Sequence, residues 1–104
     1  MKKIIIAAIM SLTISTTANA ETVTETCVEI ALLGEGVMMA RQEGKSLTAM
    51  VAFMEENLPG VDFARQMVLD AYEVPRFNTE ENKQRAVEDF ANEMSRMCFE
   101  AFSE

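Results

Sequence analysis

Apolar residues in the stretch 24–102 recur every three or four positions, and nowhere do they alternate as in a strand. This spacing is typical of amphipathic helices, because it gathers the apolar side chains on one face. Glycine and proline divide the pattern into four segments, at about 24–43, 46–58, 62–73 and 79–102. The sequence therefore predicts an all-α fold of four helices.

The first predicted helix has a start signal and a stop signal. Thr26 and Glu29 form a capping box, and Thr22 with Glu25 offers another start one turn earlier. Gly44 is the natural residue just beyond its C-terminal end. The predicted buried face comprises Cys27, Ile30, Ala31, Gly34, Val37, Met38 and Arg41.

Similar signals delimit the other three helices. Ser46 caps the second, which Pro59-Gly60 ends; Pro75 closes the third, and Asn78 or Thr79 caps the fourth. The predicted buried face of the second helix is Leu47, Met50, Val51, Met54 and Leu58, and that of the third is Ala64, Met67, Val68 and Ala71. That of the fourth is Ala86 or Val87, Phe90, Ala91, Met94, Met97, Cys98 and Ala101 or Phe102.

Residues 1–20 follow another pattern. Lys2 and Lys3 precede an apolar run from Ile4 to Met10, and a polar stretch then leads to Ala18-Asn19-Ala20. This is the pattern of a secretory signal peptide cleaved after Ala20. The apolar run is too short to span a bilayer, so we expect no stable membrane anchor, although a retained anchor is the alternative. Residues 21–104 would form a single helical domain in an oxidising compartment such as a bacterial periplasm.

Cys27 and Cys98 are the only cysteines, and an oxidising compartment would join them. The bond would close a loop of 72 residues and stabilise the fold by about 4 kcal/mol in the chain-entropy model. It would place the first and last helices side by side and antiparallel, as in an up-down-up-down bundle, regular or distorted. The alternative is a pair of free thiols for metal binding or redox exchange, but no CxxC spacing is present.

Charge and composition exclude several classes of function. Without Lys2 and Lys3, the chain has seven basic and 17 acidic residues, a net charge of −10. This argues against nucleic acid and anionic lipid and would attract a basic protein partner, although solubility is the plainer explanation. The chain has no histidine, which removes Ser-His and Cys-His catalysis and imidazole metal ligands. We predict no catalytic residue and no cofactor.

Methionine is unusually frequent in residues 21–104. A copper carrier would use thioethers as Cu(I) ligands, with Met94, Met97 and Cys98 on one helical turn. The alternatives are that methionines fill the core or line an adaptable groove for a partner. The seven residues are Met38, Met39, Met50, Met54, Met67, Met94 and Met97, and all except Met39 lie on predicted core faces.

A few single residues are candidates for binding or for structure. Arg41 ends the first helix and is expected to bond terminal carbonyls or a carboxylate across the bundle. Tyr72 is expected to anchor the turn into the last helix, or to contact a ligand. Of Phe99 and Phe102, one should pack inward and the other form an exposed apolar patch. Arg41, Gly44 and Pro75 are thus structural candidates, and Met39, Tyr72, Phe99 and Phe102 are partner-binding candidates.

Short motifs are spread over nearly all of residues 21–104: Cys27-Val28, Met39-Ala40-Arg41-Gln42-x-Gly44, Ala71-Tyr72-x-x-Pro75, Phe90 and Cys98. In these the chain resembles a broad set of small uncharacterised proteobacterial periplasmic proteins that share a signal peptide and a cysteine near each end. In size, signal and compartment it also resembles the killing factor KikA of conjugative plasmids. That second resemblance implies a mobile-element protein whose expression harms certain hosts during plasmid transfer.

The leading hypothesis is a non-enzymatic periplasmic protein that acts through protein–protein contact in the cell envelope. A conjugative plasmid is one source considered for it, with a role in transfer or host killing. Two alternatives are an inhibitor of a basic cell-wall hydrolase, of the phage-exclusion type, and a Cu(I) carrier.

Overall fold

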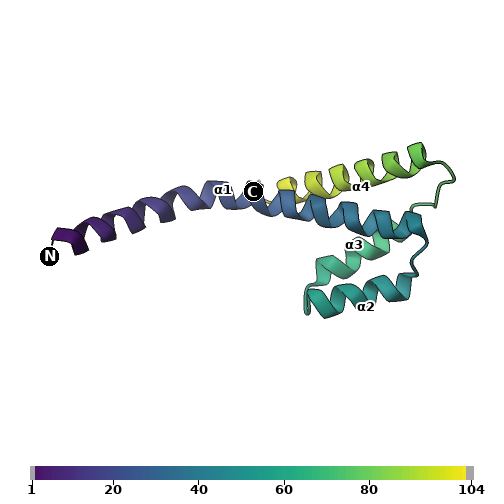
Figure 1. Ribbon diagram of the computed structural model, residues 1–104, viewed down its shortest axis with the longest axis horizontal. Coiled ribbons are helices and arrows are strands. Elements are labelled where there is room, and N and C mark those ends of the chain that lie inside the picture. Colours follow the sequence, from purple (N-terminus) through teal and green to yellow (C-terminus); the bar gives the residue numbers. More distant parts are fainter. Residues whose placement is uncertain (1, 103–104) are drawn as a thin grey trace.

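Four helices and no strand make up the part of the chain that the structure describes (Figure 1). The structure is a computed structural model, and it describes the backbone of residues 2–102 and the side chains of residues 22–102. The helices are α1 (Lys2–Glu43), α2 (Leu47–Asn57), α3 (Asp62–Tyr72) and α4 (Glu80–Ala101). The predicted all-α class is confirmed, and the bounds of α2, α3 and α4 agree with the predicted segments to within about one residue.

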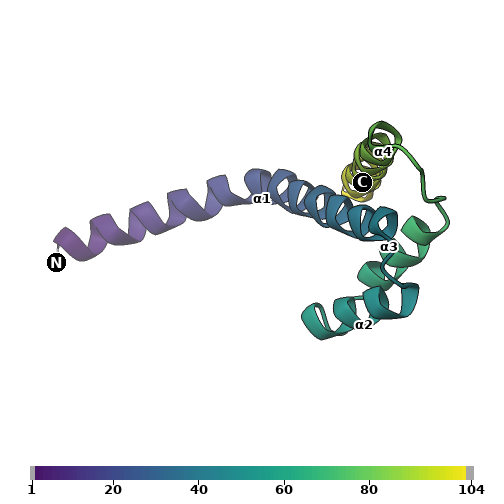
Figure 2. The same ribbon diagram turned by 45° about the vertical axis from the view of Figure 1, so that its right-hand side comes forward.

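The helices run up, down, up and down, but they do not form a regular square bundle. α1 lies in the middle and α4 packs antiparallel along it, while α3 packs on another side of α1 (Figures 1 and 2). α2 packs mainly on α3 and only slightly on α1. The distorted form of the bundle is therefore the one observed, with α2 on the outside of α3.

The predicted start of α1 near Thr24 or Thr26 is wrong for this structure, in which the helix is continuous from Lys2. Neither glycine nor proline interrupts residues 2–33, so nothing in that stretch stops a helix from extending. The N-terminal half of α1 projects beyond the other helices (Figure 1). The side chains of residues 1–21 lie outside the described residues, and cleavage after Ala20 stays a prediction.

The predicted caps Ser46 and Thr79 and the predicted stop at Gly44 are confirmed, whereas the capping boxes predicted for the first helix lie inside α1. The Ser46 hydroxyl accepts a hydrogen bond from the Ala49 backbone N–H at 3.0 Å, and the Thr79 hydroxyl accepts one from the Asn82 N–H at 3.1 Å. Gly44 has a φ of +92°, which a residue with a side chain rarely adopts. The N–H groups of Gly44 and Lys45 bond the carbonyls of Arg41 and Ala40, the pattern of a Schellman motif.

The core lies where α1, α3 and α4 meet. Gly34 allows α4 to approach closely, because a Cβ at this position would lie 3.2 Å from Met94 Cγ. Three predicted core positions are exposed instead, because they lie in the end turns of α2 and α4, where packing is incomplete: Leu47, Met97, and the last position, predicted as Ala101 or Phe102. The buried apolar residues are Cys27, Val37, Met38, Met54, Ala64, Met67, Val68, Ala71, Ala86, Val87, Phe90, Ala91 and Met94.

The predicted disulfide joins Cys27 in α1 to Cys98 in α4, with their Cα atoms 5.5 Å apart. Cys27 is fully buried, while Cys98 is partly exposed. The bond fixes the C-terminal end of α4 against the middle of α1. It therefore sets the position of the surface formed by the last turns of α4.

Candidate functional site

An open apolar groove runs between α3 and α4. Both helices pack on α1 but hardly on each other, so the space between them is left uncovered. A cavity of about 370 Å³ lies between α3 and α4, and a second of about 510 Å³ continues along α4, between α4 and the segment that joins it to α3. We call this surface the α3–α4 groove. One wall is formed by Phe63, Met67 and Asp70 of α3 and, beyond the end of α3, by Val74 and Phe77 of the segment that leads to α4. The other wall is a line along α4, formed by Ala86, Phe90, Met94, Met97 and Phe102.

The mouth of the groove near the disulfide carries large exposed apolar side chains. Phe63 and Met97 are each 46% exposed, and Phe102 is 56% exposed. Cys98 lines the same end, so the disulfide contributes to the wall. Phe63 starts α3 and Phe102 ends α4, and the antiparallel course of the two helices brings these residues to one end of the groove.

The rim of the groove is acidic. Asp70, Asp89 and Glu93 line it, together with Arg85. Asp70 accepts a hydrogen bond from the Gln66 side-chain amide at 2.9 Å, one turn away. A guanidinium nitrogen of Arg85 lies 3.9 Å from a carboxylate oxygen of Glu81, and the two form a surface ion pair.

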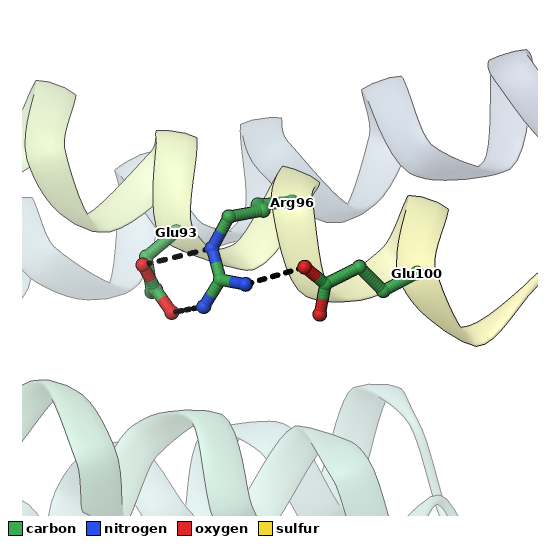
Figure 3. Close-up of polar contacts among 3 residues, drawn as sticks. All are labelled: Glu93, Arg96 and Glu100. Carbon is green, nitrogen blue, oxygen red and sulfur yellow. Dashed lines mark hydrogen bonds and ion pairs between the residues drawn. The ribbon is translucent and has the colours of Figure 1, made fainter.

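Arg96 forms a row with two glutamates along α4 (Figure 3). Its guanidinium pairs with both oxygens of Glu93 and donates a hydrogen bond to Glu100 at 2.6 Å. These hydrogen bonds raise the pKa of Arg96, which stays fully charged. One positive charge is thus shared by two carboxylates, and the row as a whole is negative beside the groove.

A separate polar cluster ties the end of α1 to the segment between α3 and α4. The Gln42 side-chain amide donates to the Pro75 carbonyl at 2.9 Å, and its carbonyl accepts from the Phe77 N–H at 2.8 Å. The Gln42 backbone carbonyl accepts from Lys83 Nζ at 2.8 Å. We call this contact region the Gln42 junction. It fixes where the chain turns into α4, and hence one wall of the groove.

Arg41 and Tyr72 complete the Gln42 junction. Arg41 Nε donates to the Val74 carbonyl at 2.8 Å, and its guanidinium lies 5.1 Å from the centre of the Tyr72 ring. The Tyr72 hydroxyl donates to the Lys45 carbonyl at 2.7 Å. Burial raises the pKa of this hydroxyl, and the positive charge of Arg41 offsets part of the effect. The turns around Gly44 and Pro75, far apart in sequence, are therefore bonded to each other.

The four partner-binding candidates do not form one surface. Phe102 lies in the groove, whereas Tyr72 is engaged at the Gln42 junction. Phe99 is 43% exposed on the opposite side of α4, and Met39 is exposed beside Lys83 on another face. The prediction that either Phe99 or Phe102 packs inward is wrong, because both rings stay about half exposed although α1 packs along this end of α4.

Sequence reasoning missed two features of this region. Gln42 is the one polar side chain in the described core, and its position four residues after the buried Met38 was the available signal. Phe63 is not on the predicted buried face of α3, although it begins a line that continues through Met67 and Asp70. Both residues stand at helical spacing from buried ones, but their roles depend on which segment packs beside them, and the sequence does not give that.

A second apolar groove lies between α1 and α2, with a cavity of about 530 Å³. Leu32 and Phe53 are exposed along it, and Gly36 leaves open space because nothing lies within 4 Å of where its Cβ would be. Lys45 lines this groove, and no acidic residue does. Unlike the α3–α4 groove, it therefore has no negatively charged rim.

The copper hypothesis loses its strongest ligand in this structure. Cys98 is bonded to Cys27, so its sulfur is not a thiolate. Met94 and Met97 border the same cavity, but Met94 is buried while Met97 is largely exposed. Among the described residues, no group of three or more His, Cys, Asp or Glu side chains is placed to hold a metal ion.

Comparison of the chain with protein-family models, curated proteins and solved structures finds no match. Within the part of the chain that the structure describes, no helix has both the length and the apolar character needed to cross a bilayer.

Proposed function

We propose that this protein acts without catalysis, by binding another protein in the cell envelope through the α3–α4 groove. The observation that carries the proposal is the exposure of Phe63, Met97 and Phe102 together at one end of a groove. Exposed large apolar side chains gathered in a concave surface are typical of protein–protein contact sites. On a domain held by a disulfide, these residues are kept in place before a partner arrives.

The polar groups of the groove support a binding role rather than a catalytic one. Two of its carboxylates are bonded along their own helices, Asp70 to Gln66 and Glu93 to Arg96. Acid–base or nucleophilic catalysis needs such groups to converge on one reacting atom. The buried polar side chain, Gln42, is fully engaged with the chain's own backbone.

The N-terminal sequence and the disulfide support a location outside the cytoplasm, with the periplasm as the compartment that we propose. A conjugative plasmid remains part of the proposal as the source of the gene, with a role in transfer or host killing. The gene neighbourhood tests this part separately. Genes for type IV secretion beside it would support the plasmid origin, and a conserved chromosomal setting without them would overturn it.

Site-specific photocrosslinking in living cells tests the binding role. A photoreactive phenylalanine derivative at Phe63 should give an adduct with one defined envelope protein. The control places the same group at Glu56, which is exposed on α2 and lies outside both grooves. No adduct at Phe63, or the same adducts at both positions, would overturn the proposal.

The acidic rim favours one particular second function, inhibition of a basic cell-wall hydrolase. A net charge of −10 over residues 21–104 would steer such an enzyme toward the groove. Lysozyme activity measured with the purified protein tests this. Inhibition that saturates near one inhibitor per enzyme would support it, and unchanged rates at a large molar excess would exclude it.

A further inference from the structure

We propose that the occupant of the α3–α4 groove is a basic amphipathic helix of the partner protein. This inference rests on the proposed function, because it names the kind of segment that the groove accepts. It is carried by three features of the groove: its dimensions, the spacing of its apolar side chains and the sign of its rim.

The groove is long enough to hold a helix. α1 forms its floor through Thr26 and Ile30, and α3 and α4 form its walls. In a regular four-helix bundle another helix would fill this position, but α2 packs on the outside of α3 instead. The wall from Ala86 to Phe102 covers 16 residue steps, roughly 24 Å at the helical rise, which is enough for a helix of about four turns.

The apolar side chains of the groove suit the face of a helix. On the α4 wall Ala86, Phe90 and Met97 stand four and seven residues apart, so they form one straight line. A guest helix with apolar residues at i, i+3, i+4 and i+7 would lay its apolar stripe along this line. The methionines Met67, Met94 and Met97 can adjust to the shape of its side chains.

The negative charge of the rim favours a guest helix of positive charge. Asp70 stands on the α3 side, and Asp89 and Glu93 stand on the α4 side. The arginines there are paired with carboxylates of the protein itself, Arg85 with Glu81 and Arg96 with Glu93 and Glu100. A helix with lysine or arginine beside its apolar stripe would therefore meet a net negative rim on both walls, whereas an acidic helix would be repelled.

Synthetic peptides provide the test. We would use a 16-residue helical peptide of leucine and lysine with an apolar stripe, the same stripe with glutamate in place of lysine, and a scrambled leucine–lysine peptide. The protein is purified from the envelope fraction of cells that express the full chain, and binding is measured by fluorescence anisotropy. We expect the basic amphipathic peptide to bind at least about tenfold more tightly than either control peptide.

Two matched pairs of variants locate the binding. Asp89→Lys and Glu88→Lys make the same charge change on neighbouring residues of α4, but only Asp89 lines the groove. Phe102→Ser and Phe99→Ser remove exposed phenyl rings from the same end of α4, and only Phe102 lines the groove. We expect Asp89→Lys and Phe102→Ser to weaken binding about tenfold, and their partners to change it less than about twofold.

Each outcome separates this inference from the proposed function. Equal binding of basic and acidic peptides, or equal effects of Asp89→Lys and Glu88→Lys, would overturn the basic helix while leaving the groove as a protein contact. A peptide that binds equally to the Phe102→Ser variant would show that it lies elsewhere and would also overturn the inference. Dimerisation that the Phe102→Ser substitution abolishes, with no binding of the basic peptide, would assign the groove to a second copy and overturn the inference. The proposed function itself fails if the Phe63 crosslink is absent or if the same adducts form at Glu56.

Discussion

The side-chain carbonyl of Gln42 accepts a hydrogen bond from the backbone N–H of Phe77 at 2.8 Å, across 35 residues of sequence. Gln42 is only 2% exposed, so water cannot replace either of its partners. Its amide donates to the Pro75 carbonyl at the same time. One buried side chain thus satisfies a donor and an acceptor of the segment that leads into α4.

Replacing Gln42 with glutamate should therefore destabilise the fold. Gln42→Glu keeps the shape but removes the amide donor and puts a carboxylate against the Pro75 carbonyl. We expect the free energy of unfolding to fall by about 1–3 kcal/mol, measured by urea denaturation. Gln66→Glu is the control, because that amide bonds Asp70 on the surface and should cost no more than about 0.5 kcal/mol. Equal losses would contradict the role given to Gln42.

Removing the disulfide should have the largest effect of any single substitution. Cys98→Ser opens a loop with a sequence separation of 71, and the chain-entropy model gives a loss of about 4 kcal/mol. The variant should unfold at a much lower urea concentration than the oxidised protein. Chemically reduced wild type should match it, which controls for the change of side chain. Two free thiols in the mass spectrum of protein purified from the periplasm would refute the bond in the native protein.

The two glycines inside α1 should respond differently to alanine. Gly36→Ala adds a methyl group where nothing lies within 4 Å, so it should stabilise the protein by about 0.5–1 kcal/mol through the higher helix propensity of alanine. At Gly34 the same methyl group would press on Met94 Cγ at 3.2 Å. We expect Gly34→Ala to be less stable than Gly36→Ala by about 1 kcal/mol in thermal or urea unfolding. The reverse order would contradict the close packing of α1 and α4.

Tyr72 should titrate above the ordinary range of tyrosine. Burial raises the pKa of its hydroxyl from 10.0 more than Arg41 lowers it. The unfolded chain then loses this proton at a lower pH than the folded one, so stability falls as the pH rises above 10.0. Tyr72 is the sole tyrosine and the chain has no tryptophan, so tyrosinate absorbance reports this residue alone. A native titration midpoint at or below that of the urea-unfolded protein would contradict the burial.

Local signals in the sequence were enough for much of the fold. Ser46, Thr79 and Gly44 act through neighbours within five residues, so their roles could be predicted without knowing the tertiary structure. The pairing of Cys27 with Cys98 followed from there being only two cysteines.

The groove could not be predicted, because periodicity identifies an apolar face but not the helix that covers it. Met97 continues the line of Phe90 and Met94 in sequence, and both methionines border the same cavity, yet Met94 is buried against Gly34 of α1 while Met97 is exposed. The position of α2 decides this, and it depends on packing between helices. Gln42 was missed for a related reason, since its partners Pro75 and Phe77 are distant in sequence.

The bond between Cys27 and Cys98 encloses α2, α3, the turns between them and most of α4 in one covalent ring. A protease that cuts the exposed Pro59-Gly60 turn would open the backbone, but both pieces would stay attached through sulfur. One piece would carry the floor of the α3–α4 groove and the other its two walls. A single cut there would therefore leave one molecule that still holds every part of the groove, and the two fragments would separate only when a reductant reached the disulfide.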